Sequence, residues 1–183
     1  MKAIIFHGTD SQAGDYWQGW LKKELEKAGL EVEMPHYPSL NNEPIEKTLA
    51  YVLPAHEFTE DTILVGHSAG GPLILAILEK LHKPIKQAIL VGGYCTLPDN
   101  GHPNPTLQPS YNWERIKTNV KDIIFINSVN DPWLCDDKQG RAMFDKLGGT
   151  LIIKNEGHFG SGTFKQTYPQ FPLVRDLILE QFA

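Results

Sequence analysis

One pentapeptide constrains the fold of this chain more than any other segment. Residues 66–70 read Gly-His-Ser-Ala-Gly, between the strand-like run 62–65 and the apolar, helix-like run 71–78. A G-x-S-x-G between a strand and a helix is typical of a nucleophile elbow, a sharp turn that points the serine hydroxyl out of a sheet. The helix N-terminus behind such a turn favours developing negative charge. The pattern predicts a catalytic Ser68, and a glycine-rich helix N-cap is the alternative.

Short strand patterns alternate with helical patterns along the whole chain. The strand patterns lie at residues 2–6, 31–34, 62–65, 87–91, 122–127 and 150–154, and the helical ones near 17–28, 44–53, 70–81, 138–147 and 173–182. This alternation predicts an α/β fold with a parallel sheet. The irregular stretch 92–110 is rich in proline, glycine and asparagine, so we expect a cap loop over the site, the alternative being a mobile surface loop.

Size and composition narrow the class of protein. A length of 183 residues is typical of one domain, and we expect a single domain over residues 1–183. The net charge is -5 and no basic block could follow a phosphate backbone, so no nucleic-acid partner is expected. No apolar run is long enough for a membrane span, and the first is too short for a signal peptide, so we expect no membrane association.

The cysteines and histidines argue against disulfide and metal chemistry. Cys95 and Cys135 are far apart and form no C-x-x-C, which indicates a reducing compartment, the cytoplasm. The seven histidines show no paired ligand spacing. We therefore expect no metal and no cofactor.

A catalytic serine needs a base, and the base needs an acid that orients it. In α/β-hydrolases the chain order is serine, acid, histidine, each at the carboxyl end of a strand. Asp131 follows the predicted strand 122–127 and His158 follows the strand 150–154, so they are the candidate acid and base. The alternatives are a plain turn residue before Pro132 for Asp131 and a surface loop residue for His158.

Other acidic residues fit the acid role less well. Asp136 and Asp137 lie at the start of a predicted helix, where an acid more often serves as a cap or a partner of the helix dipole. Glu156 is only two residues from His158. We therefore keep Asp131 as the expected acid.

An oxyanion hole needs two N–H donors aimed at the charge of a tetrahedral intermediate. The backbone of Ala69, directly after the serine, is the first candidate, and Thr9 after the first strand is the second, with Gly8 or Asp10 as alternatives. His7 either takes part in catalysis or anchors that loop.

Four aromatic residues flank the catalytic segments or the cap loop, and we expect them in the substrate pocket: Tyr94, Trp113, Trp133 and Phe159. Aromatic walls would favour an apolar acyl or alcohol group. For the two tryptophans, packing in the core or on a helix is the alternative.

Several motifs together resemble one family. They are residues 17–26, the pentapeptide 66–70, residues 113–117, Asn130-Asp131-Pro132 and Gly157-His158-Phe159. Through them most of the chain resembles the retinoblastoma-binding-protein type of small serine hydrolase, which includes YdeN-like bacterial members. The resemblance implies a compact α/β-hydrolase fold with about six strands and a triad of Ser68, Asp131 and His158. Neither cysteine lies in an L-x-C-x-E signature, so a pocket-protein partner is not implied.

The expected function is that of a serine hydrolase of the small-ester carboxylesterase type, acting through an acyl-enzyme on Ser68. Its partner would be a small-molecule ester or amide. An amidase or peptidase with the same triad is the nearest alternative, because the same groups serve both reactions. A non-catalytic interaction module that keeps the triad as a remnant is an alternative of another class, and a metal-dependent hydrolase is the weakest.

Overall fold

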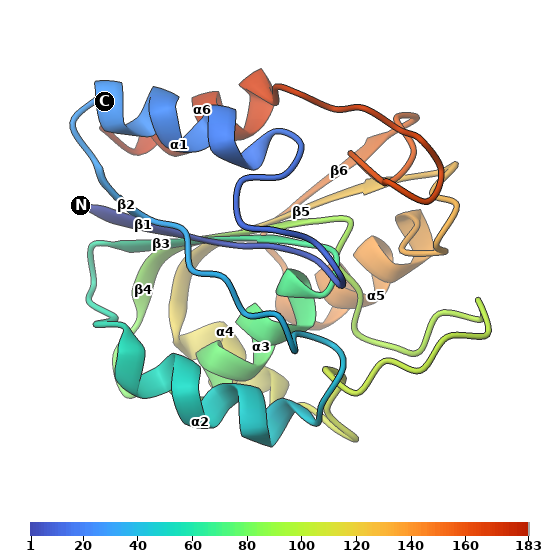
Figure 1. Cartoon of the computed structure of the whole chain (residues 1–183). Coiled ribbons are helices and arrows are strands. Elements are labelled where there is room, and N and C mark those ends of the chain that lie inside the picture. The colour runs from blue at the N-terminus through green and yellow to red at the C-terminus, as the bar shows by residue number, and fades with distance from the viewer. Residues whose placement is uncertain (183) are drawn as a thin grey trace.

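A six-stranded, all-parallel sheet forms the middle layer of the molecule (Figure 1). The computed structural model describes residues 1–182. In the sheet the strands follow the order β2-β1-β3-β4-β5-β6. The strands are β1 (Lys2–Phe6), β2 (Glu31–Glu33), β3 (Thr62–His67), β4 (Ile85–Val91), β5 (Val120–Ser128) and β6 (Thr150–Lys154).

Helices cover both faces of this sheet (Figure 1). One face carries α1 (Gln18–Lys27) and α6 (Pro172–Leu179), which is followed by the 3-10 turn Glu180–Phe182. The opposite face carries α2 (Ile45–Ala55), α3 (Gly70–Lys80), α4 (Trp113–Thr118) and α5 (Asp137–Leu147). Among residues 1–182, no helix has the length and apolar character that crossing a membrane requires.

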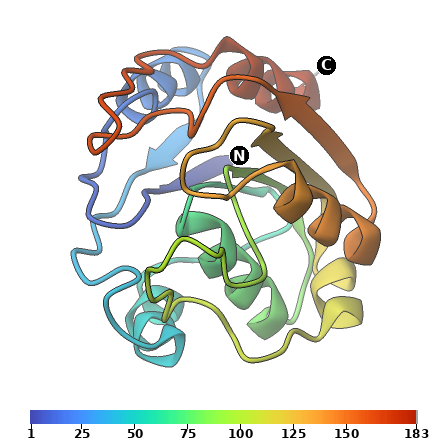
Figure 2. The ribbon, with the colours of Figure 1, turned by 90° about the vertical axis from the view of Figure 1, so that its right-hand side faces the viewer.

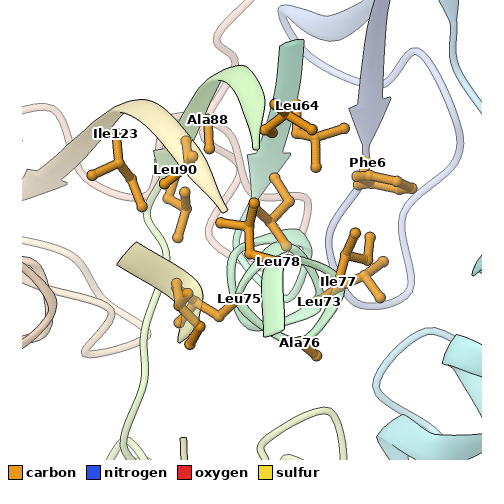
Figure 3. Packing of buried hydrophobic residues seen from close by; sticks show 14 of the residues in the cluster. Phe6, Leu64, Leu73, Leu75, Ala76, Ile77, Leu78, Ala88, Leu90 and Ile123 are labelled. Atoms are coloured by element: carbon orange, nitrogen blue, oxygen red, sulfur yellow. The ribbon is translucent and has the colours of Figure 1, made fainter. Parts of the chain in front are cut away.

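The strands are apolar on both faces because each face packs against helices. Successive side chains of a strand point to opposite faces, so Ile4 and Phe6 join the cluster under α2 and α3, while Ala3 and Ile5 join the cluster under α1 and α6. Figure 3 shows part of the first cluster, in which the labelled side chains of α3 lie on one side of the row formed by Phe6, Leu64 and Leu90 of the sheet. A helix buried on nearly every side explains the continuous apolar run after Ser68.

The prediction of a parallel α/β sheet is confirmed, and the elements differ from it mainly at their ends. β5 is longer than the expected 122–127, and β4 begins at Ile85 instead of residue 87. The last helix ends at Leu179, before the expected residue 182. Helix α4 was not predicted, because six residues are too few for a helical period to be recognised. Asn112 is the N-cap of this helix, and its side chain accepts a hydrogen bond from the Arg115 amide.

The parallel arrangement brings the loops of the candidate site to one edge. All strands run in the same direction, so the segments after β1, β3, β4, β5 and β6 leave the sheet at its carboxyl edge. Figure 2 shows the molecule from the side on which these loops lie. In open α/β sheets this edge is where ligands bind.

Candidate active site

The turn at Ser68 is sharp and strained. Ser68 lies between β3 and α3 with a φ of 53°, a left-handed conformation that costs a non-glycine residue energy. A Cβ at Gly66 would lie 2.5 Å from the carbonyl oxygen of Gly70, and one at Gly70 would lie 2.8 Å from that of Phe6. The backbone of strand, turn and helix is therefore too close for side chains at either glycine. Ser68 is partly exposed between buried neighbours.

The candidate base and acid form a buried pair. Nδ1 of His158 lies 2.7 Å from Oδ2 of Asp131, and both residues are buried. The other carboxylate oxygen, Oδ1, accepts a hydrogen bond of 2.8 Å from the Trp133 amide. Both oxygens of Asp131 are thus occupied, which fixes the carboxylate toward the ring. With the proton on Nδ1, Nε2 of His158 keeps a lone pair that can accept a proton.

Ser68 and His158 line the same cavity, which has a volume of about 590 Å³. This volume is in the usual range for small-molecule sites. Gly92, with a φ of 55°, packs directly on the His158–Asp131 pair, because a Cβ there would lie 3.4 Å from Nδ1 of His158. The structure therefore brings the three predicted residues Ser68, Asp131 and His158 into one site.

The backbone of His158 is held from both sides by side chains. Its amide donates to Oε1 of Gln166 at 2.9 Å, and its carbonyl oxygen accepts from Nε2 of His67 at 2.8 Å. The preceding amide, that of Gly157, donates to Oδ1 of Asn130 at 2.9 Å. These contacts tie the segment of the base to the turn at Ser68 and to the segment of the acid.

His67 has a defined tautomer. A carbonyl oxygen only accepts, so Nε2 of His67 carries the proton that it donates to His158. Nδ1 is then a bare acceptor, buried and without a partner among the described residues. Burial lowers the pKa of His67 to about 3, and the nearby His158 adds to the effect. His67 is therefore neutral at physiological pH.

The segment after β1 runs beside Ser68. A Cβ at Gly8 would lie 3.0 Å from Cβ of Ser68, so the backbone of this segment touches the serine. His7 is an anchor: its Nε2 accepts from the Tyr37 amide at 2.9 Å, and its Nδ1 therefore donates to the Gly8 carbonyl oxygen at 2.7 Å. Burial lowers the pKa of His7, which favours this neutral form.

Asn41 links that segment to the predicted cap loop. Its buried amide donates to Oγ1 of Thr9 at 3.0 Å and to Oδ1 of Asn104 at 3.1 Å, and accepts from the Thr106 amide at 3.2 Å. Tyr94 donates to the same Asn104 oxygen at 2.9 Å. Both N–H groups and the oxygen of the Asn41 amide thus take part in joining two segments.

Residues 92–110 lie along the cavity and are fixed at several points. Gln139 of α5 accepts from the amides of Cys95 and Thr96, both at 3.2 Å, and Asn100 donates to the Trp133 carbonyl oxygen at 2.8 Å. Several residues of this stretch line the cavity, from Tyr94 to Asn104. The stretch forms part of the cavity wall, and its role as a cap over the site stays a prediction.

Two of the four expected pocket aromatics lie elsewhere. Tyr94 and Trp133 line the cavity, but Trp113 and Phe159 do not. Phe159 is fully buried in the core under α1 and α6, where its ring stacks on Phe171 at 5.3 Å. Trp113 begins α4 and packs against Tyr111 at 4.8 Å between ring centroids. Their positions in sequence, near the site, do not correspond to positions in its wall.

The alternative acids have other contacts. Asp136 is the N-cap of α5 and accepts from the Lys138 amide at 3.0 Å. Glu156 pairs with Lys154 at 2.8 Å and accepts a hydrogen bond from Tyr168. Neither is the partner of His158 in the described structure.

One cysteine lies beside the pair in space. Single ligand atoms of Asp131, Cys135 and His158 lie within 4.8 Å of one another. Sequence spacing did not reveal this cluster, because His158 comes from the segment after β6 and the other two residues from the segment after β5. In the observed arrangement the hydrogen bond to Asp131 occupies Nδ1 of His158. Burial raises the pKa of the Cys135 thiol, which keeps it protonated.

Comparison with known proteins places this chain in a family. The sequence profile described as "Serine hydrolase" matches residues 3–178. The chain belongs to the serine hydrolase family. It is 30% identical over 177 residues to "Serine hydrolase RBBP9" of Rattus norvegicus, with 90% of each chain covered. It is also 27% identical over 187 residues to "Putative hydrolase YdeN" of Bacillus subtilis (strain 168), with 100% of this chain and 96% of the relative covered.

Solved structures agree with this assignment. The crystal structure of the ydeN gene product from B. subtilis superposes with a TM-score of 0.86 at 26% identity, over 99% of this chain and 98% of the other. A protein of the alpha/beta hydrolase superfamily from Xanthomonas campestris pv. campestris superposes with a TM-score of 0.69 at 15% identity, over 98% and 97% of the two chains, and supports the fold alone. The resemblance drawn from the sequence motifs is confirmed, as is the compact α/β-hydrolase fold.

Three supporting residues of this serine hydrolase were not recognised from its sequence. His67 had the place of the variable residue in the pentapeptide, and Asn41 and Gln166 belong to no motif. Their partners are backbone atoms or side chains that only the fold brings near, the His158 backbone for Gln166 and Thr9 for Asn41. The left-handed φ of 65° at Asn41 marks a constrained turn, but sequence alone does not show it.

The strain at Ser68 predicts a stability gain on replacement by glycine. Ser68→Gly is expected to unfold with a free energy about 1 kcal/mol above that of Ser68→Ala, because glycine adopts a positive φ without the steric cost of a Cβ. Chemical denaturation of both variants measures the difference. Equal free energies of unfolding would contradict a strained turn.

The buried neutral His67 predicts a loss of stability in acid. Its folded-state pKa of about 3 lies below the ordinary value of 6.5, so between these values the unfolded chain binds more protons and stability falls as the pH falls. By pH 4.5 this contribution amounts to about 2 to 3 kcal/mol. In His67→Gln the free energy of unfolding should decline less between pH 7 and 4.5. An unchanged decline would contradict the assignment to His67.

Proposed function

We propose that this serine hydrolase cleaves small carboxylic esters through an acyl-enzyme on Ser68. The observation that carries the proposal is the shared cavity of Ser68 and His158, together with the hydrogen bond of 2.7 Å that fixes the His158 ring to buried Asp131. Serine, base and orienting acid are the groups that nucleophilic acyl transfer requires.

The first half of the reaction forms the acyl-enzyme. Nε2 of His158 takes the proton of the Ser68 hydroxyl while Oγ attacks the ester carbonyl carbon. The tetrahedral intermediate collapses, the bond between the carbonyl carbon and the alcohol oxygen breaks, and His158 gives its proton to the leaving alcohol. In the second half a water molecule repeats the sequence and releases the acid. Asp131 stays ionised and stabilises the imidazolium in each half.

The oxyanion of the intermediate would be stabilised by the amides of Ala69 and Thr9. Ala69 follows the serine at the N-terminus of α3, where the helix dipole favours negative charge. The segment of Thr9 touches Ser68 through Gly8. Within residues 1–182, neither amide donates to another backbone carbonyl or to a side chain, which leaves both for a ligand. Asn41, which bonds the Thr9 hydroxyl, would hold the second donor in place.

The two free cysteines support a location in a reducing compartment such as the cytoplasm. Cys95 and Cys135 are both free thiols, and both are buried. Free thiol pairs of this kind are usual where the cell keeps cysteines reduced.

Active-site labelling tests the proposal. A fluorophosphonate probe should add one adduct to the wild-type protein and none to Ser68→Ala, because only a serine activated by a base attacks the phosphorus. Intact mass spectrometry measures the adduct. The matched control is Ser110→Ala, an exposed serine outside the cavity wall, which should label like the wild type.

The turnover of a matched ester and amide distinguishes the proposed esterase activity from its alternatives. We expect faster turnover of 4-nitrophenyl acetate than of 4-nitroacetanilide, because the alcohol leaves more readily than the amine. Faster cleavage of the anilide would support an amidase instead. The absence of any adduct and of any turnover would support an interaction module.

A further inference from the structure

Amide and hydroxyl side chains make up much of the cavity wall around Ser68. They come from the segment after β1, the segment before α2, residues 92–110 and the segment after β6. Such side chains both donate and accept hydrogen bonds without carrying charge. Members of this set are Ser11, Asn41, Asn42, Asn100, Asn104 and Thr163.

Aliphatic side chains are missing from this wall. Among the described residues that line the cavity, none is alanine, valine, leucine, isoleucine or methionine, and the larger apolar side chains are those of Tyr16, Tyr94, Pro103, Trp133 and Cys135. A methylene of an acyl chain gains free energy on binding only if it is buried against apolar atoms. A long acyl chain would instead cover amide groups and deprive them of water. The wall therefore fits a short acyl group.

The wall also lacks a cation for an acidic substrate. No lysine or arginine is among the described residues that line the cavity. Asp10, exposed at its edge, carries a carboxylate that accepts a hydrogen bond of 3.0 Å from Asn42. A phosphate or carboxylate group would be repelled by this carboxylate and would meet no lysine or arginine among the described lining residues. The cavity thus favours a neutral ligand.

Part of the polar wall is fixed, and part has unused hydrogen-bonding capacity. Asn41, Tyr94 and Asn104 are joined by mutual hydrogen bonds. By contrast, the described residues supply no partner for Oδ1 of Asn42 or for the hydroxyl of Thr163. These groups, at the cavity and open to solvent, can bond to hydroxyl groups of a ligand.

We propose that the substrate is a short-chain acyl ester of a polyhydroxylated alcohol, such as an acetylated glycerol or sugar. This inference rests on the proposed function, since the ester would be cleaved by Ser68. Water and the ester give a short carboxylic acid and the free polyol: the bond between acyl carbon and polyol oxygen breaks, and that oxygen takes the proton from His158. The polyol hydroxyls bond to the amides and hydroxyls of the wall.

Two paired comparisons of kcat/KM test the substrate class in the wild-type protein. Acetyl and octanoyl esters of 4-nitrophenol test chain length, and glyceryl monoacetate against butyl acetate tests the alcohol. We expect a preference of about tenfold for the acetyl ester and about tenfold for the glyceryl ester, because unpaired polar groups penalise the apolar competitor.

Variants of the wall connect the preference to named residues. Asn42→Leu and Thr163→Val each replace a polar group by an apolar one, and each should lower the ratio of glyceryl to butyl turnover by about threefold. The matched control, Gln170→Leu, adds the same leucine at an exposed position outside the cavity wall and should leave the ratio unchanged.

The outcomes separate this inference from the proposed function. Equal or faster turnover of the octanoyl and butyl esters, with Ser68 still labelled by the fluorophosphonate, would overturn the substrate class and leave the esterase proposal standing. Labelling of Ser68 without any cleavage of glyceryl acetate would do the same. Loss of labelling would overturn both.

Discussion

Close approach of backbone to backbone around residue 68 is the constraint on which the site depends. Gly66 and Gly70 allow strand and helix to meet with no room for a Cβ, and a Cβ at Gly71 would lie 2.8 Å from Cα of Gly93 in the segment after β4. This packing joins the turn at Ser68 to the segments after β1 and β4. Ser68 is forced into a left-handed conformation, and it faces the cavity from a rigid support.

Buried and half-buried polar side chains hold the surrounding loops. Gln166 and His67 fix the two sides of the His158 peptide backbone, Gln139 fixes the start of residues 92–110, and Asn41 joins that stretch to Thr9. The backbone amides and carbonyls of loops lack the regular hydrogen bonds of a helix or a sheet, so these side chains supply hydrogen-bond partners instead. The catalytic groups proposed here are thus positioned by a shell of neutral polar residues.

Sequence patterns predicted the strands and helices, whose apolar residues recur with a regular period. They did not predict the contacts that form only when the chain folds. The apolar runs predicted the parallel sheet, and chain order placed Asp131 and His158 at the carboxyl ends of β5 and β6, where the structure pairs them. Proximity in sequence did not predict the cavity wall: Phe159 follows His158 directly, but its ring packs in the core cluster under α1 and α6 and does not line the cavity. The side-chain amides of Gln139 and Asn41 bond to partners 44 and 32 positions away, and such contacts show no period.

Detection of a covalent intermediate would decide whether Ser68 carries the acyl group during hydrolysis. The protein would be mixed rapidly with 4-nitrophenyl acetate and quenched in acid, and its peptides would then be mapped by mass spectrometry. We expect a burst of about one equivalent of nitrophenol and an acetyl group on Ser68. A burst with no acetyl group on Ser68, or an acetyl group on another residue, would contradict acyl transfer through Ser68.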